Sequence, residues 1–335
     1  MKNNEKEKIG KLILGYRKAK ILFVAVSLGV FSLTREAGSG FRRVARLLGV
    51  NQRAMEIFLD ALAATGFLEK KSGFYRNTEI TGRFLVPESP EYLGHNLIYQ
   101  NIIWDAWSGL EEVLKTGKPR FPLRSLLSER EDFLRGYIRG MGDIAVKPAA
   151  EIAEIIGFSG PGKILDVGGG PGAYAAAFLK RNKNLRGVIL DLPETLGITR
   201  GLFKKDPVLE RLSFQEGDYH KTFFGKNKYD IVLFSNVTHD EGPEENLALF
   251  RKAFSALRRG GRVIAHDFML DETGTSPEFA ALFSVHMLVY TNKGRVYSEK
   301  EYGKWIKKAG FTALFSREIC RGSDNSSRII VGKKP

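Results

Sequence analysis

The sequence predicts an α/β fold, in which a doubly wound sheet follows a smaller, mostly helical N-terminal domain. The stretch Lys163–Asp191 has the composition of a strand, a glycine-rich turn, a helix and a second strand. That order is the first unit of a doubly wound sheet. Beyond it, short apolar runs continue to alternate with segments of helical composition. The preceding residues contain mainly helical patterns.

Seven apolar runs in the second half of the chain have the length and the β propensity of strands. The first run is followed by Gly168, Gly169, Gly170 and Gly172, which let the backbone turn sharply and let a ligand approach closely. We predict strands at Lys163–Val167, Gly187–Leu190, Leu212–Gln215, Tyr229–Phe234, Arg262–His266, Thr312–Ser316 and Arg328–Val331.

The N-terminal residues have a winged-helix pattern. Lys8–Val30 predicts one or two helices, and Phe41–Leu48 and Asn51–Thr65 predict two more with a turn at Gly49. Gly66–Phe84 alternates weakly, as a small β wing does. The second helix of this pair has a buried stripe at Met55, Leu59 and Leu62.

Three segments connect this pattern to the sheet. Glu91–Lys115 predicts a long helical segment that contains Trp104 and Trp107. The proline-rich and basic stretch 116–125 predicts a linker, and Phe133–Gly157 predicts one or two helices.

Length and composition indicate a globular protein with room for two domains. The chain has 335 residues, of which 43% are hydrophobic and 27% charged. Its one cysteine, Cys320, excludes an internal disulfide and fits a reducing compartment. No Cys or His cluster has the spacing of a zinc site.

The apolar run Ile21–Phe31 superficially resembles the core of a secretion signal. It begins late, no small-residue cleavage site follows it, and eleven residues are too few to span a bilayer. We therefore predict a buried helix, no membrane association and a cytoplasmic protein.

The formal net charge of +14 and the winged helix raise the alternative of DNA binding. However, the basic residues are spread from Lys2 to Lys334, and the acids Glu56 and Asp60 would face phosphates on the second helix. We therefore interpret the charge as a surface property that can aid the capture of an anionic substrate.

Two acids indicate which ligand the glycine turn binds. Asp191 ends the second strand, where a carboxylate can accept hydrogen bonds from ribose hydroxyls. Asp166 lies just before the glycines, where it would repel a pyrophosphate and attract a cation. S-adenosylmethionine, which carries a sulfonium, an ammonium and a ribose, therefore fits better than a dinucleotide.

Five motifs occur in a characteristic order: DVGGGPG from Asp166, DLPETL from Asp191, GDYHKTFF from Gly217, FSNVTHDEGPEENL from Phe234 and GGRVIAHDFML from Gly260. With them, the chain resembles the S-adenosylmethionine-dependent O-methyltransferases of the plant caffeate and bacterial small-molecule type. The resemblance extends over nearly the whole chain.

The resemblance implies a Rossmann-like seven-stranded sheet of the class I methyltransferases, with its last strand antiparallel. It also implies that the winged helix is a dimerisation domain and that the protein is a homodimer acting on a small-molecule acceptor. We predict a dimerisation domain at residues 1–90, a helical linker and pocket region at 91–157 and a catalytic domain at 158–335.

The resemblance also implies a set of donor-binding residues. Gly168 and Gly170 would expose backbone to the methionine part, Asp191 would hold the ribose and Asp218 would accept from the adenine amino group. The remaining predicted donor-binding residues are Asp166, Leu192, Tyr219 and Ser235.

His239 matches the catalytic histidine of the family and is the predicted general base. An imidazole with an ordinary pKa of about 6.5 can take the proton of a phenol as the methyl group moves. Asp267 would orient the imidazole and stabilise its charged form. The alternation of side chains along a strand directs His266 to the opposite face. Predicted acceptor contacts are Met141, Met287, Tyr290 and Thr291.

Two departures from the family leave the acceptor atom open. Glu241 stands where the family commonly has tryptophan, and Val296 stands where plant enzymes have a second acid. A C-, N- or S-methyltransferase, a repurposed relative and a DNA-binding regulator that senses the donor therefore remain alternatives. We predict no metal, because Asp240 and Glu241 are interpreted as solvated loop acids.

Overall fold

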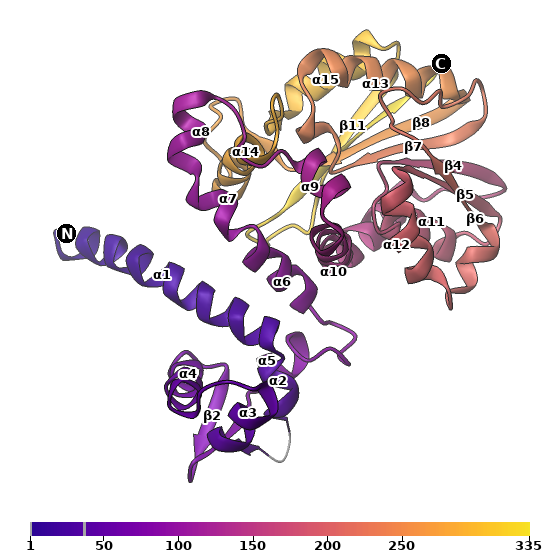
Figure 1. Ribbon diagram of the computed structural model, residues 1–335. Coiled ribbons are helices and arrows are strands. Elements are labelled where there is room, and N and C mark those ends of the chain that lie inside the picture. The colour runs from indigo at the N-terminus through magenta and orange to yellow at the C-terminus, as the bar shows by residue number, and fades with distance from the viewer. Residues whose placement is uncertain (1, 36–37) are drawn as a thin grey trace. The chain divides into compact units, whose positions relative to one another are not determined.

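The computed structural model describes residues 2–35 and 38–335, and the side chains of residues 6–35 and 38–335. They form two compact units, Met1–Trp104 and Asp105–Pro335 (Figure 1). The finer division at residues 90 and 157 stays a prediction. None of the helices in the described part of the chain has the length and apolar composition that spanning a bilayer requires.

The first unit contains helices and a three-stranded wing with the strand order β1-β3-β2. Asn51 begins α4, because its side chain accepts a hydrogen bond from the N–H of Ala54 at 3.0 Å. The predicted stripe Met55, Leu59 and Leu62 is buried. The elements are α1 (Lys2–Leu28), α2 (Val30–Leu33), β1 (Ser39–Gly40), α3 (Phe41–Leu48), α4 (Gln52–Ala64), β2 (Leu68–Lys71), β3 (Phe74–Asn77), α5 (Glu79–Phe84) and α6 (Gly94–Ile102).

The wing is shorter than the sequence predicts. Its strands end at Asn77, and Glu79–Phe84 forms α5. The buried Thr81 donates a hydrogen bond to the carbonyl of Phe67 at 2.7 Å, which fastens α5 to the segment before β2. Weak alternation over so few residues does not separate a strand from a short helix. Asp60 of α4 accepts hydrogen bonds from wing side chains, Lys70 at 2.6 Å and Tyr75 at 2.7 Å.

The predicted long helical segment Glu91–Lys115 is broken into three helices, because Ile103 and Gly109 interrupt it. The predicted linker 116–125 also ends early, since α9 begins at Leu123. By contrast, one continuous helix covers the region for which one or two were predicted. These elements are α7 (Trp104–Ser108), which begins at the last residue of the first unit, α8 (Leu110–Thr116), α9 (Leu123–Glu129) and α10 (Glu131–Ile156).

The second unit is built on a seven-stranded sheet with the order β11-β12-β8-β7-β4-β5-β6. Neighbouring strands from β8 to β6 are parallel, and β12 is antiparallel to both β8 and β11. The seven predicted strands and the antiparallel last strand are thus confirmed. They are β4 (Gly162–Val167), β5 (Leu185–Asp191), β6 (Leu212–Glu216), β7 (Tyr229–Ser235), β8 (Leu257–Asp267), β11 (Thr312–Ile319) and β12 (Ser327–Lys333).

Helices cover both faces of this sheet (Figure 1). One core packs α10, α11 (Ala173–Arg181) and α12 (Pro193–Phe203) against strand residues such as Ile164. The other packs α13 (Pro243–Ala256) and α15 (Glu299–Lys308) against the next residue, Leu165. Beside the sheet lie α14 (Glu278–Tyr290), the 3₁₀ helices η1 (Pro207–Arg211) and η2 (Thr238–Asp240), and the short parallel pair β9 (Met269–Leu270) and β10 (Tyr297–Ser298).

Candidate active site

The glycine-rich turn makes a tight bend between β4 and α11. Gly168 and Gly170 have φ angles of 64° and 50°, in the left-handed region that favours glycine. A Cβ on Gly168 would lie 2.7 Å from Cγ2 of Val237 and 3.6 Å from the ring of Tyr219. The bend therefore leaves bare backbone beside the residues that follow β6 and β7.

Asp191, at the carboxyl end of β5, is fixed to this bend. Its Oδ2 accepts a hydrogen bond from the N–H of Gly170 at 2.8 Å, and its Oδ1 accepts one from Leu192 at 2.7 Å. Burial raises the pKa of Asp191, although the side chain keeps some accessible surface. The predicted ribose-binding acid is therefore preoriented at the edge of the glycine bend.

Asp166 is completely buried beneath the bend. Its Oδ2 accepts a hydrogen bond from the N–H of Ala175 at 3.1 Å, and its Oδ1 has no hydrogen-bond partner among the described residues. Burial raises the pKa of Asp166 to about 7. The carboxyl group therefore has no surface with which to touch a ligand, and it could affect one only through its charge or its hold on α11.

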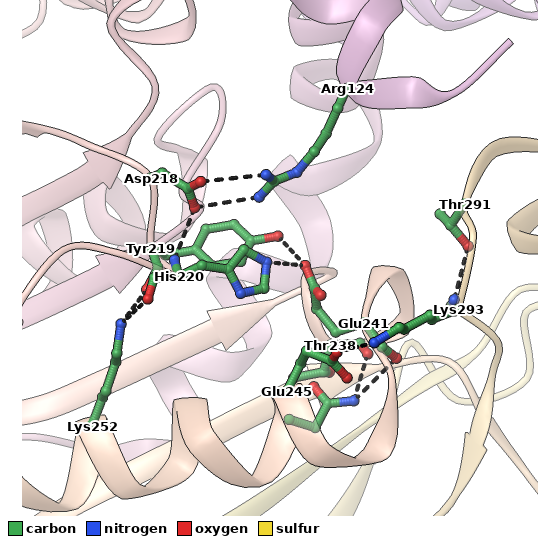
Figure 2. Close-up of polar contacts among 12 residues, drawn as sticks. Arg124, Asp218, Tyr219, His220, Thr238, Glu241, Glu245, Lys252, Thr291 and Lys293 are labelled. Atoms are coloured by element: carbon green, nitrogen blue, oxygen red, sulfur yellow. Dashed lines mark hydrogen bonds and ion pairs between the residues drawn. The ribbon is translucent and has the colours of Figure 1, made fainter.

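Arg124, which the sequence did not suggest as a site residue, forms an ion pair with Asp218, the predicted adenine contact (Figure 2). Its guanidinium donates to both carboxylate oxygens of Asp218 at 3.3 Å, from α9 across to the segment after β6. Asp218 also accepts from the N–H of His220 at 2.9 Å. The carboxylate of Asp218 is therefore turned toward α9.

Glu241 holds two side chains of the segment after β6 (Figure 2). Its Oε1 accepts from the hydroxyl of Tyr219 and lies beside Nε2 of His220, both at 2.8 Å. Only 9% of Glu241 is exposed, so its interpretation as a solvated loop acid is wrong. Where the family commonly has tryptophan, this chain thus has a carboxylate that fixes the tyrosine predicted to cover adenine.

Lys252 on α13 supports the same segment from below. Its ammonium donates hydrogen bonds to the carbonyls of Tyr219 at 2.9 Å and of Thr222 at 3.2 Å, and also to the carbonyl of His220. One side chain therefore satisfies three backbone acceptors that no strand or helix pairs. A lysine on a polar helix face gives no sign of this role in the sequence.

The predicted pair of His239 and Asp267 is in direct contact. Nδ1 of His239 in η2 lies 2.6 Å from Oδ1 of Asp267 at the end of β8. Oδ2 of Asp267 accepts from the hydroxyls of Thr238 and Tyr302, both at 2.9 Å. Asp267 is fully buried and His239 is 5% exposed. The imidazole is therefore held in one orientation by a carboxylate that is itself fixed.

The charges of this pair stabilise each other. Burial lowers the pKa of His239, but the charge of Asp267 and the hydrogen bond to it outweigh burial and raise that pKa to about 9. Burial raises the pKa of Asp267, whereas His239, Thr238 and Tyr302 together bring it below its ordinary value. At neutral pH the pair is therefore an imidazolium and a carboxylate.

Asp240 lies on the other side of the imidazole, with its Oδ1 3.7 Å from Nε2 of His239. Burial raises the pKa of Asp240 to about 6, and its Oδ1 has no hydrogen-bond partner among the described residues. The side chain of Asp240 is 24% exposed, so Asp240 is a partly buried carboxyl group and not a fully solvated loop acid.

His266 lies away from the Asp267 pair, as predicted. Its Nδ1 is 2.8 Å from the hydroxyl of Ser235 and its Nε2 is 2.7 Å from that of Ser327. Burial lowers the pKa of His266 to about 4, so the ring is neutral. The hydroxyl of Ser235, which was predicted to contact the methyl donor, therefore forms a hydrogen bond with His266.

Aromatic side chains surround His239 on its α14 side. The ring of Phe283 meets the imidazole edge-on at 4.9 Å between centroids. Phe268 contacts both Phe279 and Phe283, at 4.8 Å and 4.9 Å. These three phenylalanines form an apolar wall next to the imidazole, which the sequence did not indicate.

The structure locates the predicted acceptor contacts on two helices. Met287 and Tyr290 on α14 are buried, and Met141 on α10 is partly exposed. Thr291 ends α14: its hydroxyl donates to the carbonyl of Met287 at 2.8 Å and accepts from the N–H of Gly294 at 2.9 Å. That hydroxyl therefore caps a helix.

Tyr137 on α10 is a further site residue that the sequence did not reveal. Burial raises the pKa of its phenol, and the charges of Asp240 and Asp191 add to the effect. Tyr137 therefore lies within electrostatic reach of both acids. Within the described part of the chain, no group of three or more His, Cys, Asp or Glu side chains is arranged to hold a metal ion.

These residues fit S-adenosylmethionine. The backbone at Gly168 leaves no room for a Cβ, the oriented Asp191 stands beside it, and the ring of Tyr219 lies next to the same glycine. Hydrogen-bond acceptors and an aromatic surface are what a ribose and an adenine require.

Comparisons with known proteins agree with this fit. A sequence model of the O-methyltransferase domain matches residues 110–312, and one of the O-methyltransferase dimerisation domain matches residues 11–87. A 3-hydroxy-5-methyl-1-naphthoate 3-O-methyltransferase of Streptomyces sahachiroi is 28% identical, covering 96% of this chain and 94% of its own length.

Solved structures give the same result. An O-methyltransferase family protein from Burkholderia thailandensis is 27% identical with a TM-score of 0.85, covering 98% of this chain and 97% of its own. The structure of PigF with SAH is 26% identical with a TM-score of 0.84, covering 98% and 99%. Neither supports the alternative of a DNA-binding regulator. The chain belongs to the O-methyltransferase family and is an S-adenosylmethionine-dependent methyltransferase with an N-terminal dimerisation domain.

Proposed function

We propose that this enzyme methylates a hydroxyl group of a small aromatic molecule, with His239 as the general base. The observation that carries the proposal is the 2.6 Å contact between His239 and a buried Asp267 whose other oxygen is held by two hydroxyls. This contact occupies Nδ1 and leaves Nε2 as the nitrogen that can exchange a proton with an acceptor.

The donor would be held by the carboxyl edge of the sheet. The backbone at Gly168 and Gly170 would take the methionine part, Asp191 the ribose hydroxyls, and Asp218 with Tyr219 the adenine. Leu192 would pack on the adenine face, with Ser235 at the end of β7 nearby and Asp166 acting from beneath. When bound, S-adenosylmethionine supplies a methyl group on a cationic sulfur, which also favours a phenolate nearby.

The protein residues handle the proton of the acceptor. In its neutral form, His239 accepts that proton at Nε2 as the acceptor oxygen gains the methyl group. Asp267 stabilises the resulting imidazolium and keeps Nδ1 protonated throughout. The proton then leaves to solvent when the product departs. Asp240, next to Nε2, would contact the acceptor or receive the proton in turn.

Several features support an aromatic acceptor. Phe268, Phe279 and Phe283 offer flat apolar surface beside the imidazole. The Streptomyces relative acts on a hydroxynaphthoate, by its name. Met141, Met287 and Tyr290 would complete the acceptor surface. We also propose a homodimer formed through the dimerisation domain, and the single cysteine supports a cytoplasmic location.

A direct assay tests the function. Purified protein incubated with S-adenosylmethionine and a panel of naphthols and hydroxybenzoates is expected to yield S-adenosylhomocysteine and an aryl methyl ether in equal amounts. Mass spectrometry with fragmentation locates the added methyl group. A product methylated on carbon or nitrogen, or no turnover on any phenol, would contradict the proposal.

The pH dependence of the rate tests the base. Because only neutral His239 can accept a proton, kcat/KM for the acceptor should rise with pH up to the pKa of about 9 in the free enzyme. Asp267→Asn removes the charge that raises this pKa, so its profile should rise at lower pH, although to a smaller maximum. Profiles between about pH 6 and 10 measure both. A wild-type profile that is flat across this range would exclude His239 as the general base.

A further inference from the structure

We propose that His286 is a specificity-determining residue, whose Nε2–H donates a hydrogen bond to a second oxygen of the acceptor, next to the hydroxyl that is methylated. The acceptor class is then an aromatic hydroxyl compound that also carries a carbonyl or carboxylate oxygen. This inference rests on the proposed function, since it concerns the acceptor of that same site.

Trp107 fixes the tautomer of His286. Nε1 of Trp107 lies 3.1 Å from Nδ1 of His286. An indole N–H only donates, so Nδ1 of His286 must be the acceptor and cannot carry a proton. The ring is therefore neutral, and its proton is on Nε2. Burial, with the nearby charge of His239, lowers the pKa of His286 to about 4, which agrees with this assignment.

Nε2–H of His286 is available for a ligand. Within the described part of the chain, the structure gives it no hydrogen-bond partner. The side chain of His286 is partly exposed, so its ring is within reach of a ligand. A ligand oxygen that covers this donor would satisfy it, whereas an apolar group would cut it off from water without a partner, which is costly.

His286 and His239 both contact the same row of aromatic side chains on α14. A stripe of rings follows one face of α14, at helical spacing: Phe279, Phe283, His286 and Tyr290. Phe283 contacts the imidazole of His239 at 4.9 Å between centroids, and His286 is stacked on Phe283 at 5.4 Å. A flat acceptor lying along this stripe would meet the base at one position and the donor of His286 at another.

The two histidines would therefore differ in how their charge behaves during the reaction. His239 is cationic in the free enzyme and must lose its proton to act, whereas Trp107 keeps His286 neutral throughout. Only His286 thus offers a donor that does not change with the catalytic cycle. It is suited to recognise an oxygen acceptor, and it would therefore give the site a preference among phenols that the apolar wall alone cannot provide.

Matched ligands test this inference without turnover. Calorimetry on enzyme saturated with S-adenosylhomocysteine compares 2-naphthol with 3-hydroxy-2-naphthoate and its methyl ester, which differ in the second oxygen group. The wild type should prefer the ligands with that group, and His286→Phe should reduce the preference by about tenfold or more, the size of a lost hydrogen bond to a charged or polar group. The carboxylate and ester arms distinguish an anionic from a neutral oxygen.

Three further variants separate recognition from structure. His286→Gln retains an N–H near the position of Nε2 and should restore much of the preference. Trp107→Phe removes the indole N–H that keeps the proton of His286 on Nε2, and it should weaken the preference in part. Leu282→Ala, an exposed residue of the same helix, should leave it unchanged. If His286 had only a structural role, His286→Phe would lower the free energy of unfolding without changing the ratio of the affinities for 3-hydroxy-2-naphthoate and 2-naphthol. An unaltered ratio in His286→Phe would therefore overturn the inference. The calorimetry measures binding alone. A failure of methyl transfer in the panel assay would therefore contradict the proposed function without deciding the role of His286.

Discussion

His239→Ala is expected to lower kcat by roughly 10² to 10⁴-fold, the usual contribution of a general base, while the affinity for S-adenosylhomocysteine stays nearly unchanged. The reason is that the imidazole contacts Asp267 and the phenylalanine wall, whereas the predicted donor contacts are at the glycine bend. Turnover with a phenol found in the panel assay, and calorimetry with S-adenosylhomocysteine, measure the two quantities.

His239→Gln is the matched variant for this experiment. Glutamine can still donate to Asp267 and fill much of the space, but it cannot accept a proton as a base. It should therefore be as slow as the alanine variant while unfolding at a higher denaturant concentration. If the glutamine variant kept wild-type turnover, His239 would serve only to position the acceptor.

Asp267→Ala should destabilise the fold by about 3–5 kcal/mol at pH 7, the cost of breaking a buried ion pair on one side. The substitution removes the counter-charge of the buried His239, which must then give up its proton in the folded protein, so that the stability contributed by the ion pair is lost. It also leaves the hydroxyls of Thr238 and Tyr302 without their shared acceptor. Urea unfolding followed by circular dichroism measures the loss, and activity should fall as well.

The pH dependence of this loss identifies its cause. The folded-state pKa of His239, about 9, is raised above the ordinary 6.5. Its contribution to stability is therefore complete below about pH 6.5 and disappears as the pH rises through 9. The Asp267→Ala penalty should consequently shrink between pH 7 and 10. Asp267→Asn, which keeps the shape and a hydrogen bond, should cost less at pH 7. A penalty independent of pH would indicate lost packing instead of a lost charge pair.

The sequence was sufficient where local pattern determines structure. The strands of the sheet have buried, mainly apolar runs such as Ile164–Val167, and the acids Asp191 and Asp267 could be located at strand ends from this pattern. The pairing of His239 with Asp267 was predicted from the family resemblance, and it agrees with the rule that parallel strands bring their carboxyl ends to one edge.

What the sequence did not reveal depends on contacts between distant segments. Arg124 and Asp218 are 94 residues apart, and no periodicity links them. Trp107 and His286 are 179 residues apart. Glu241 was interpreted as a solvated loop acid because charged residues in loops usually are exposed, and its contacts with Tyr219 and His220 place it in the interior instead. Such pairs are fixed by how the elements pack, which composition and spacing do not encode.

The hold of Lys252 on three carbonyls has a consequence for how this enzyme can diverge. Because a side chain from α13 satisfies the backbone at residues 219, 220 and 222, the course of that loop depends less on the side chains of Tyr219 and His220. Substitutions at Tyr219 and His220 can therefore accumulate and adjust ligand preference without misplacing the main chain. The main-chain course of the loop is thus supported by a residue outside it, so the side chains of the loop can vary during evolution while the main chain keeps its course.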